Sequence, residues 1–292
     1  MVEASVNVNG VLTTGDRAVV SVFDHGFLYG DGVYETLRTY NGQPFLLQQH
    51  FSRLRASAAR LSLAELPSDQ DLETRILATI PGVYPPGEVT IRILITRGIG
   101  ELSYDPSACP VPTTVIIVRP HHDPPDSLIR DGVRLVIASV VRNHPRSVDP
   151  SIKSNNLLNN ILAMQEAIRL GADEAVLLNH RGELTECSQS NLFAVRNGVV
   201  LTPPLNAGLL EGVTRNFLFK VGADLGIQIF ERPLREADLD TIDELFITST
   251  TREIIPVVLV GDRVIGSGHP GPVTADLLTR LRELARSMTR TR

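Results

Sequence analysis

The chain has 292 residues, which is enough for two domains or for one large domain. Its hydrophobic content of 42% and charged content of 21% are ordinary for a globular protein. The net charge of −5 argues against a nucleic-acid partner, because phosphate binding favours a positive surface. No apolar run approaches the roughly 20 residues that span a bilayer, so we expect no membrane association.

Cysteine and lysine usage narrows the cellular setting and the chemistry. Cys109 and Cys187 lie far apart in the sequence, and we expect two unpaired thiols in a reducing cytoplasm. Lys153 and Lys220 are the only lysines among the 28 lysine and arginine residues. Genomic base composition explains this shortage better than function does. It still leaves just two candidates for an amine nucleophile, because a guanidinium stays charged.

The first part of the chain alternates strand and helix signals. Leu47, Phe51 and Leu54 are spaced by four and three residues, which is typical of one face of a helix. Ser68 is expected to cap a second helix. Runs rich in β-branched residues indicate strands. The predicted order is strands at 19–23 and 33–40, helices at 46–63 and 68–80, and strands at 89–96 and 113–119.

A proline-rich segment then separates the two parts of the chain. Its three prolines cannot continue a helix or a central strand. We therefore predict a small N-terminal domain at 1–118, a linker at 119–127 and a larger C-terminal domain at 128–292. His121, His122 and Asp123 of the linker could be read as metal ligands. No further ligand cluster lies nearby in the sequence, so we predict no metal site.

The second part of the chain mixes short strands with helices, which indicates an α+β or α/β fold in two domains. One helix is expected to begin at Ser154 or Asn155, and another after Gly212, ending at Gly226. The first of these should bury a stripe of Leu157, Ile161, Met164 and Ile168. The other predicted elements are strands at 133–140, 175–178, 192–195, 199–201, 227–230, 244–248 and 254–260, and a helix at 274–287.

Four segments carry groups suited to chemistry, and each also has a simpler interpretation. Lys153 precedes a predicted helix start, whose partial positive charge disfavours a protonated amine, although lysines often flank helices by chance. Glu186 precedes an apolar strand; buried there it would need a cationic partner, but it could also face solvent in a turn. Segment 208–215, with Thr214, could bind phosphate at a helix start. A glycine at a helix start is common, however. The hydroxyls of 247–251 could line an anion site, or they could form a plain turn.

In this order and spacing the segments resemble the class IV, or fold type IV, aminotransferases, which depend on pyridoxal 5′-phosphate (PLP). The resemblance covers nearly the whole chain and includes 23–35, 50–58, 152–156 and 243–251. It implies an α+β fold with a small α/β N-terminal domain and a larger C-terminal domain with a mixed, barrel-like β core. PLP would lie in the cleft between them. The resemblance also implies a homodimer, or a higher oligomer, whose partner chain contributes loops to the pocket.

The resemblance assigns cofactor roles to residues of this chain. Lys153 is implied to form the aldimine with PLP and then to carry the proton between Cα and the cofactor. Glu186 is implied to pair with the pyridine nitrogen, and Arg53 to bind the phosphate. Leu210 would pack against the cofactor ring. The implied remainder of the phosphate site is Gly212, Val213, Thr214, Ser249 and Thr250.

The positions that would contact the substrate are mixed. Arg92 and Tyr29 match pocket positions of branched-chain aminotransferases, where the arginine binds the second carboxylate of glutamate. Leu158, five positions after the lysine, is instead typical of D-amino-acid enzymes. The arginine–histidine pair with which those enzymes bind the substrate carboxylate, just after segment 96–98, is absent. The predicted substrate-binding residues are Tyr29, Tyr34, Arg38, Arg92 and Thr251.

The leading hypothesis is a PLP-dependent transaminase that follows a ping-pong mechanism. Its partners would be a branched-chain or other hydrophobic L-amino acid as amino donor and 2-oxoglutarate as the 2-oxo acid acceptor. Arg92 and the missing carboxylate-binding pair favour this hypothesis. The alternatives are a D-amino-acid or (R)-amine transaminase, an aminodeoxychorismate lyase, and a non-catalytic binding protein that keeps the fold.

Overall fold

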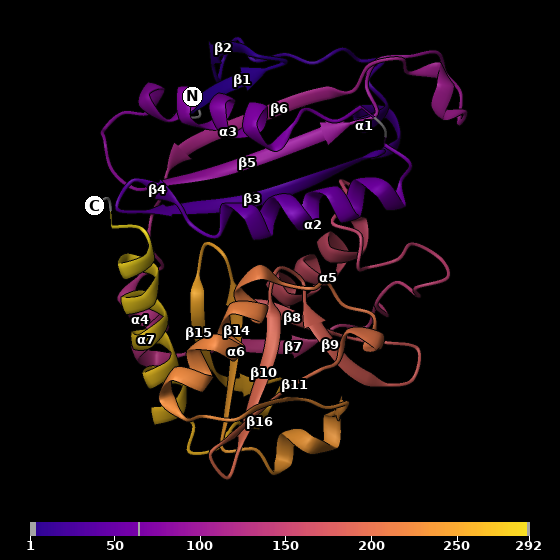
Figure 1. The fold of residues 1–292 in the computed structure, drawn as a ribbon. Coiled ribbons are helices and arrows are strands. Elements are labelled where there is room, and N and C mark those ends of the chain that lie inside the picture. Colours follow the sequence, from indigo (N-terminus) through magenta and orange to yellow (C-terminus); the bar gives the residue numbers. More distant parts are fainter. Residues whose placement is uncertain (1–3, 64, 291–292) are drawn as a thin grey trace. The chain divides into compact units, whose positions relative to one another are not determined.

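The structure is a computed structural model that describes residues 4–63 and 65–290, and these divide into two compact units (Figure 1). Of the described residues, unit 1 contains those up to His122, the short segment Ile152–Asn156 and those from Thr289 onward. Unit 2 contains Asp123–Ser151 and Leu157–Met288. The first junction between the units falls inside the predicted linker.

Unit 1 is built on an antiparallel sheet that has six strands within the described residues, in the order β2-β1-β6-β5-β3-β4. Helices α2 and α3 pack on one face of this sheet and enclose an apolar core with it (Figure 1). The elements are β1 (Ser5–Val8), β2 (Val11–Thr14), α1 (His25–Tyr29), β3 (Gly32–Tyr40), β4 (Gln43–Pro44), α2 (Leu47–Arg60), α3 (Asp69–Thr79), η1 (Ile80–Gly82), β5 (Val89–Thr96), η2 (Pro106–Ala108) and β6 (Thr113–Pro120).

The two faces of this sheet differ because strand residues alternate in direction. Val33, Glu35 and Leu37 of β3 are fully buried on the face that α2 covers. Tyr34 and Thr36 point to the opposite face, where Tyr34 is half-buried. The sheet therefore has an apolar face toward the helices and a polar, aromatic face on the other side.

The predicted helices of unit 1 are confirmed, but one predicted strand is wrong. The helices expected at 46–63 and 68–80 are α2 and α3, and Ser68 Oγ caps α3 by accepting a hydrogen bond from Asp71 N at 3.1 Å. Residues 19–23 form no strand, and Val19 is 76% exposed. No strand of the described residues pairs with this segment, so its apolar alternation has no sheet face on which to pack.

Unit 2 is built on a mixed sheet of ten strands within the described residues. Strands β10, β14, β15, β7, β8 and β9 pair in that order, and a further pairing of Glu186 with Asn191 joins β9 back to β10. These six strands thus close into a ring. The predicted α+β fold with a mixed, barrel-like core in the larger part of the molecule is therefore confirmed.

The elements of unit 2 run from the end of the linker to the last helix. They are α4 (Asp126–Asp131), β7 (Val133–Ile137), α5 (Leu158–Arg169), β8 (Glu174–Leu178), β9 (Glu183–Cys187), β10 (Asn191–Arg196), β11 (Val199–Thr202), η3 (Leu205–Ala207), α6 (Val213–Leu225), β12 (Ile229–Glu231), β13 (Leu234–Arg235), η4 (Glu236–Asp240), β14 (Glu244–Ser249), β15 (Glu253–Val260), β16 (Arg263–Val264) and α7 (Pro272–Met288). No helix in the part of the chain that the structure describes is long and apolar enough to cross a membrane.

The segment Ile152–Asn156 pairs with β3 instead of starting a helix. Asn155 N donates to Gly32 O at 2.8 Å, and Ser154 forms a β-bridge with Val33. The prediction that a helix begins directly after Lys153 is therefore wrong. These pairings keep the backbone extended, and α5 begins only at Leu158.

The buried face of α5 also differs from the prediction. Ala163 and Ala167 are fully buried, whereas Ile161 and Ile168 of the predicted stripe are 48% and 63% exposed. The two alanines allow α5 to pack closely on β8 and join its apolar cluster. The periodicity of large apolar residues pointed to the wrong face, because the closest packing is made by the smallest side chains.

Candidate active site

Lys153 is fixed to unit 1 through its backbone. Its N–H donates to Ser57 Oγ of α2 at 3.1 Å, and its carbonyl accepts a hydrogen bond from Tyr34 N of β3 at 3.0 Å. The side-chain Nζ lies 4.4 Å from the centroid of the Tyr34 ring. Among the described residues no carboxylate pairs with Nζ. The amine is therefore held in place without a counter-charge, which suits an amine nucleophile.

Arg53 belongs to a buried cluster with Glu35 and His50. Its Nε donates to Glu35 Oε1 at 2.7 Å and its Nη2 to Glu35 Oε2 at 2.8 Å, while His50 Nδ1 lies 2.7 Å from Oε2. Burial alone would raise the pKa of Glu35, but Arg53 and His50 outweigh it and hold that pKa far below its ordinary value. Burial lowers the pKa of His50, which fits a neutral ring that donates its Nδ1 proton to Glu35.

The other face of the unit 1 sheet carries two of the predicted substrate residues as diagonal neighbours. The register of β3 and β5 places Arg92 opposite Thr36, and therefore next to Arg38. Arg38 is 3% exposed, and its guanidinium lies 4.2 Å from the centroid of the Tyr40 ring. Arg92 lies 4.1 Å from the ring of Tyr34 and, among the described residues, has no carboxylate partner. Of the two, Arg92 is better placed to bind an anion.

The structure brings Tyr34, but not Tyr29, together with Lys153. The ring of Tyr34 contacts Arg92 as well as Lys153. Tyr29 lies in α1 and is 37% exposed, and its ring contacts are with His25 and Tyr104. Tyr34 and Arg92 therefore form one group with the lysine within unit 1.

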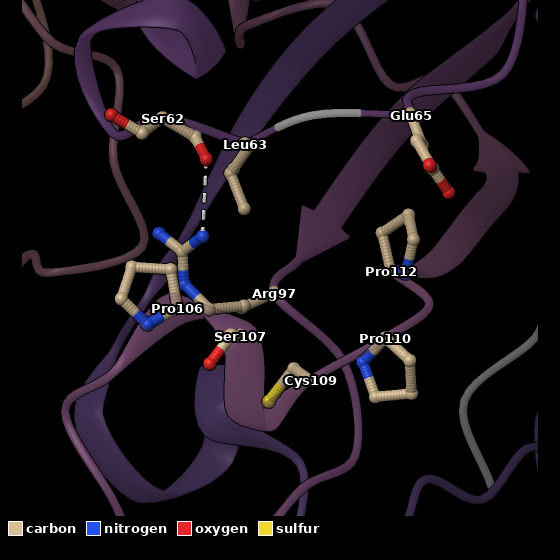
Figure 2. Close-up of a pocket in the computed structure, with 9 residues that line it drawn as sticks. All are labelled: Ser62, Leu63, Glu65, Arg97, Pro106, Ser107, Cys109, Pro110 and Pro112. Atoms are coloured by element: carbon tan, nitrogen blue, oxygen red, sulfur yellow. Dashed lines mark hydrogen bonds between the residues drawn. The ribbon is translucent and has the colours of Figure 1, made fainter.

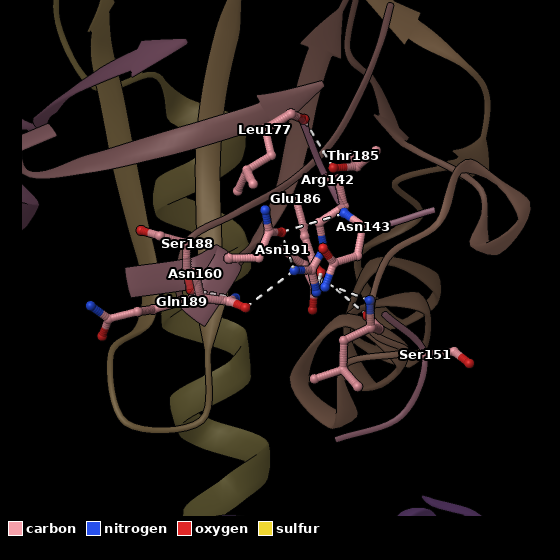
Figure 3. A network of polar contacts seen from close by, with 12 residues as sticks. Arg142, Asn143, Ser151, Asn160, Leu177, Thr185, Glu186, Ser188, Gln189 and Asn191 are labelled. Atoms are coloured by element: carbon pink, nitrogen blue, oxygen red, sulfur yellow. Dashed lines mark hydrogen bonds and ion pairs between the residues drawn. The ribbon is translucent and has the colours of Figure 1, made fainter. Parts of the chain in front are cut away.

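In unit 2, Glu186 lies in a network of polar contacts (Figure 3). Its Oε2 accepts hydrogen bonds from Leu210 N at 3.1 Å and Asn191 Nδ2 at 3.3 Å, and its Oε1 lies 2.7 Å from Arg142 Nη2. Glu186 is 5% exposed, so the solvent-facing interpretation of this residue is wrong. The cationic partner that burial requires is Arg142.

The start of α5 orients Arg142. Its Nη1 donates to Asn159 Oδ1 at 3.0 Å and to Asn160 Oδ1 at 3.1 Å, and Asn160 Nδ2 in turn donates to Ser188 O at 2.9 Å (Figure 3). No sequence pattern singles out Arg142, because the chain is rich in arginine and a single arginine after a predicted strand does not differ from the others. Asn191 is missed for a related reason, since its role depends on the pairing that closes the ring of strands.

Helix α6 begins at Val213, Gly212 is its N-cap, and among the described residues no side chain caps its first N–H groups. A Cβ at Gly212 would lie 2.0 Å from Asn191 Oδ1, so the close approach of this helix start to Asn191 requires a glycine. The N–H groups of Val213 and Thr214 have no partner within the helix. An uncapped helix start with a threonine hydroxyl is a suitable phosphate site.

The hydroxyl run at the end of β14 has mixed roles. Ser249 Oγ accepts a hydrogen bond from Arg252 N at 3.3 Å and so stabilises the turn. Thr250 and Thr251 are half-buried in that turn. Thr248 Oγ1 is buried without a hydrogen-bond partner in the described part of the chain, which is unusual for a hydroxyl and fits a site for a polar ligand group.

A pocket of about 260 Å³ in unit 1 contains none of the predicted cofactor residues (Figure 2). Its buried cation, Arg97, donates from Nε to Asp31 at 2.5 Å and from Nη2 to Leu61 O at 2.7 Å. These bonds tie Arg97 to Asp31, just before β3, and to the end of α2, so Arg97 stabilises the fold and its guanidinium is already paired with a carboxylate of the chain. The lining residues are Ser62, Leu63, Glu65, Arg97, Pro106, Ser107, Cys109, Pro110 and Pro112.

The groups described above fit the parts of PLP one by one. Lys153 offers an amine without a counter-charge, and Glu186 offers a buried carboxylate for a pyridine nitrogen. A guanidinium, an uncapped helix start and the partnerless hydroxyl of Thr248 are all groups that bind phosphate. Taken unit by unit, these groups are of the chemical types that bind a phosphorylated, cationic ring that reacts with an amine.

The family profile named Amino-transferase class IV matches residues 32–260. The chain belongs to the class IV aminotransferases. It is therefore a PLP-dependent transaminase, and this part of the sequence-based prediction is confirmed.

Individual relatives of this transaminase fall into two groups by name. A Methanocaldococcus jannaschii protein with the provisional name branched-chain-amino-acid aminotransferase is 39% identical over 279 residues, which is 96% of each chain. The D-alanine aminotransferase of Bacillus licheniformis is 32% identical over 281 residues, covering 96% of this chain and 97% of the relative.

Solved structures show the same architecture. The branched-chain amino acid aminotransferase of Escherichia coli matches with a TM-score of 0.90 and 28% identity, over 99% of this chain and 97% of that chain. The branched-chain aminotransferase of the thermophilic archaeon Thermoproteus uzoniensis, solved with norvaline, matches with a TM-score of 0.89 and 30% identity, over 98% and 95%. A further branched-chain amino acid aminotransferase, solved with pyridoxamine 5′-phosphate, matches with a TM-score of 0.93 and 29% identity, over 98% and 96%. The predicted fold type is therefore confirmed.

Proposed function

We propose that this transaminase moves an amino group between branched-chain or other hydrophobic L-amino acids and 2-oxoglutarate. The branched-chain names of one sequence relative and three solved structures support the amino donor. Arg92 supports the acceptor. The D-alanine aminotransferase relative makes a D-amino-acid transaminase the second candidate, which the experiment below separates from the first.

The proposed cofactor site uses the residues predicted from the sequence. Bound PLP would supply an electron sink for the bond that breaks at the substrate's Cα. Lys153 Nζ would bind the cofactor's carbonyl carbon and move the proton at Cα, and its support by Ser57 and Tyr34 favours this role. The residues proposed to hold the cofactor, through side chains or backbone N–H groups, are Arg53, Glu186, Leu210, Gly212, Val213, Thr214, Ser249 and Thr250.

Arg92 is the observation that carries the proposed acceptor. It lies on the sheet face that also holds Tyr34 and Lys153, and no carboxylate neutralises it among the described residues. A guanidinium in this state favours a second carboxylate on the substrate. 2-Oxoglutarate and glutamate have that group, whereas a branched-chain amino acid has an apolar side chain instead.

Half-reactions test the donor directly. The PLP form would be mixed separately with L-leucine, D-alanine and an (R)-amine, and the loss of its absorbance would be followed. We expect L-leucine to react. Reaction only with D-alanine or with the amine would refute the proposed donor, and release of aminobenzoate from aminodeoxychorismate would instead indicate a lyase.

A pair of arginine variants tests the acceptor. Arg92→Gln should raise the KM for 2-oxoglutarate by about tenfold or more, because a hydrogen-bonded charge pair is lost, while the KM for L-leucine should change little. Arg119→Gln is the matched control, since Arg119 lies on the same sheet and is exposed. Equal effects of the two variants on 2-oxoglutarate would contradict the role of Arg92.

The proposal includes a homodimer in a reducing cytoplasm. Cys109 and Cys187 are both free thiols, which supports the compartment. Apolar side chains such as Phe27 and Leu102 are 68% and 69% exposed, which supports a further surface of contact.

A further inference from the structure

Glu35 occupies a position where packing alone favours an apolar residue. Its neighbours on the same strand face, Val33 and Leu37, belong to the apolar core, and all three are fully buried. A buried carboxylate is costly unless it is paired and hydrogen-bonded, and an apolar side chain of similar size often serves stability equally well. The stability of unit 1 therefore gives no reason for an acid at this position.

The side-chain contacts of Glu35 are with two residues of α2, Arg53 and His50. Arg53 is held through two parallel hydrogen bonds of 2.7 and 2.8 Å, which fix both the position and the plane of its guanidinium. His50, one turn earlier on α2, braces the carboxylate from a third direction at 2.7 Å. The depressed pKa of Glu35 keeps this acceptor ionised throughout the neutral range.

The same helix also holds the backbone of the reactive lysine. Ser57, four residues after Arg53 on α2, accepts the hydrogen bond from Lys153 N at 3.1 Å. Residues four apart lie on one face of a helix. Fixing the guanidinium of Arg53 against β3 therefore also fixes it relative to the backbone of Lys153, within a single unit of the fold.

From these contacts we propose that Glu35 is a positioning residue for PLP binding, which holds Arg53 in the orientation that binds the cofactor's phosphate. The inference rests on the proposed role of Arg53. Two effects of Glu35 oppose each other: its charge weakens the attraction of Arg53 for an anion, and its hydrogen bonds restrict a flexible side chain. The bidentate geometry implies that the second effect is the larger.

The test compares ligands with and without a phosphate. Apo-protein would be titrated with PLP and with pyridoxal, and inorganic phosphate would be tested as a competitor of PLP. Glu35→Gln keeps the shape and removes the charge. We expect it to reduce the preference for PLP over pyridoxal by about tenfold and to weaken competition by phosphate, because charge-assisted bonds that hold Arg53 are lost. Glu35→Asp, which keeps the charge, should restore part of the preference and also serves if the glutamine variant does not fold.

Two further variants separate the ways in which the inference can fail. Asp31→Asn breaks another arginine–carboxylate pair of unit 1, that with Arg97, and should lower stability without changing the PLP-to-pyridoxal preference. Arg53→Ala should abolish the preference. If it does not, the proposed phosphate site is wrong. If it does, and Glu35→Gln binds PLP and phosphate as well as or better than the wild type, the positioning role of Glu35 is wrong.

Discussion

The two lysines of the chain differ in how the structure holds them. Lys153 is hydrogen-bonded through its backbone to Ser57 and Tyr34, whereas Lys220 is exposed on α6. We expect Lys153→Ala to lose nearly all transamination and Lys220→Arg to keep it, because only Lys153 lies in the group that fits the cofactor. Borohydride reduction in the presence of PLP, followed by peptide mass mapping, checks this. A label found on Lys220 instead would contradict the assignment.

At Gly212 there is no room for a Cβ atom. Gly212→Ala should displace Asn191, because the new Cβ would lie 2.0 Å from its Oδ1. Asn191 donates to both Glu186 and the Leu210 carbonyl, so the displacement should weaken PLP binding by about tenfold. Equilibrium titration with PLP measures the change. Gly87→Ala is the control, since a Cβ at Gly87 meets nothing within 4 Å, and a similar loss there would refute the explanation.

At the scale of elements, α2 and β3 form the support of the site in unit 1, and this support is sensitive to acid. The folded pKa of His50 lies below its ordinary value of 6.5, so below about that pH the unfolded chain binds a proton that the folded chain does not. The pKa of Glu35 is also lowered, from an ordinary value of 4.5, and adds a second loss of stability in stronger acid.

Stability should therefore fall in two stages as the pH decreases. We expect Tm to fall through His50 once the pH drops below about 6.5, and to fall further through Glu35 below about pH 4.5. His50→Gln should flatten the first stage relative to the wild type and leave the second. Thermal unfolding of apo-protein across this range measures both. An unchanged slope in the first stage would show that another group is responsible.

Local sequence patterns predicted a helix end well where a single residue type, such as a capping serine or a glycine, determines that end. Ser68 capped α3 as expected, and glycines bounded α6 at Gly212 and Gly226. The patterns failed where a segment distant in the sequence determines the local structure or the partner of a side chain. The pairing of Asn155 with β3 prevents the predicted helix start, and the ion pair that holds Glu186 needs Arg142 from the irregular segment after β7. Such contacts depend on topology, which spacing along the chain does not encode.

At the scale of the whole molecule, one apolar patch of unit 1 stays exposed. Its two segments are joined in the backbone, since Gly100 N donates to Phe23 O and Asp24 forms a bridge with Ile99. The patch is formed by Phe23, Phe27, Ile99, Leu102 and Tyr104, which are between 53% and 91% exposed. Contiguous apolar surface of this kind is rare on monomers, so the patch is the best candidate for the contact of the proposed homodimer.

Charge placed on this patch should break the proposed dimer. A double variant, Phe27→Asp with Leu102→Asp, would bring two carboxylates to each side of a symmetric contact, where burial and repulsion both oppose association. We expect the wild type to elute as a dimer and the double variant as a monomer in size-exclusion chromatography with light scattering. Ile168→Asp is the control, because Ile168 is 63% exposed on α5 of unit 2 and outside the patch. A dimer that survives the double variant but not Ile168→Asp would place the contact on α5 instead.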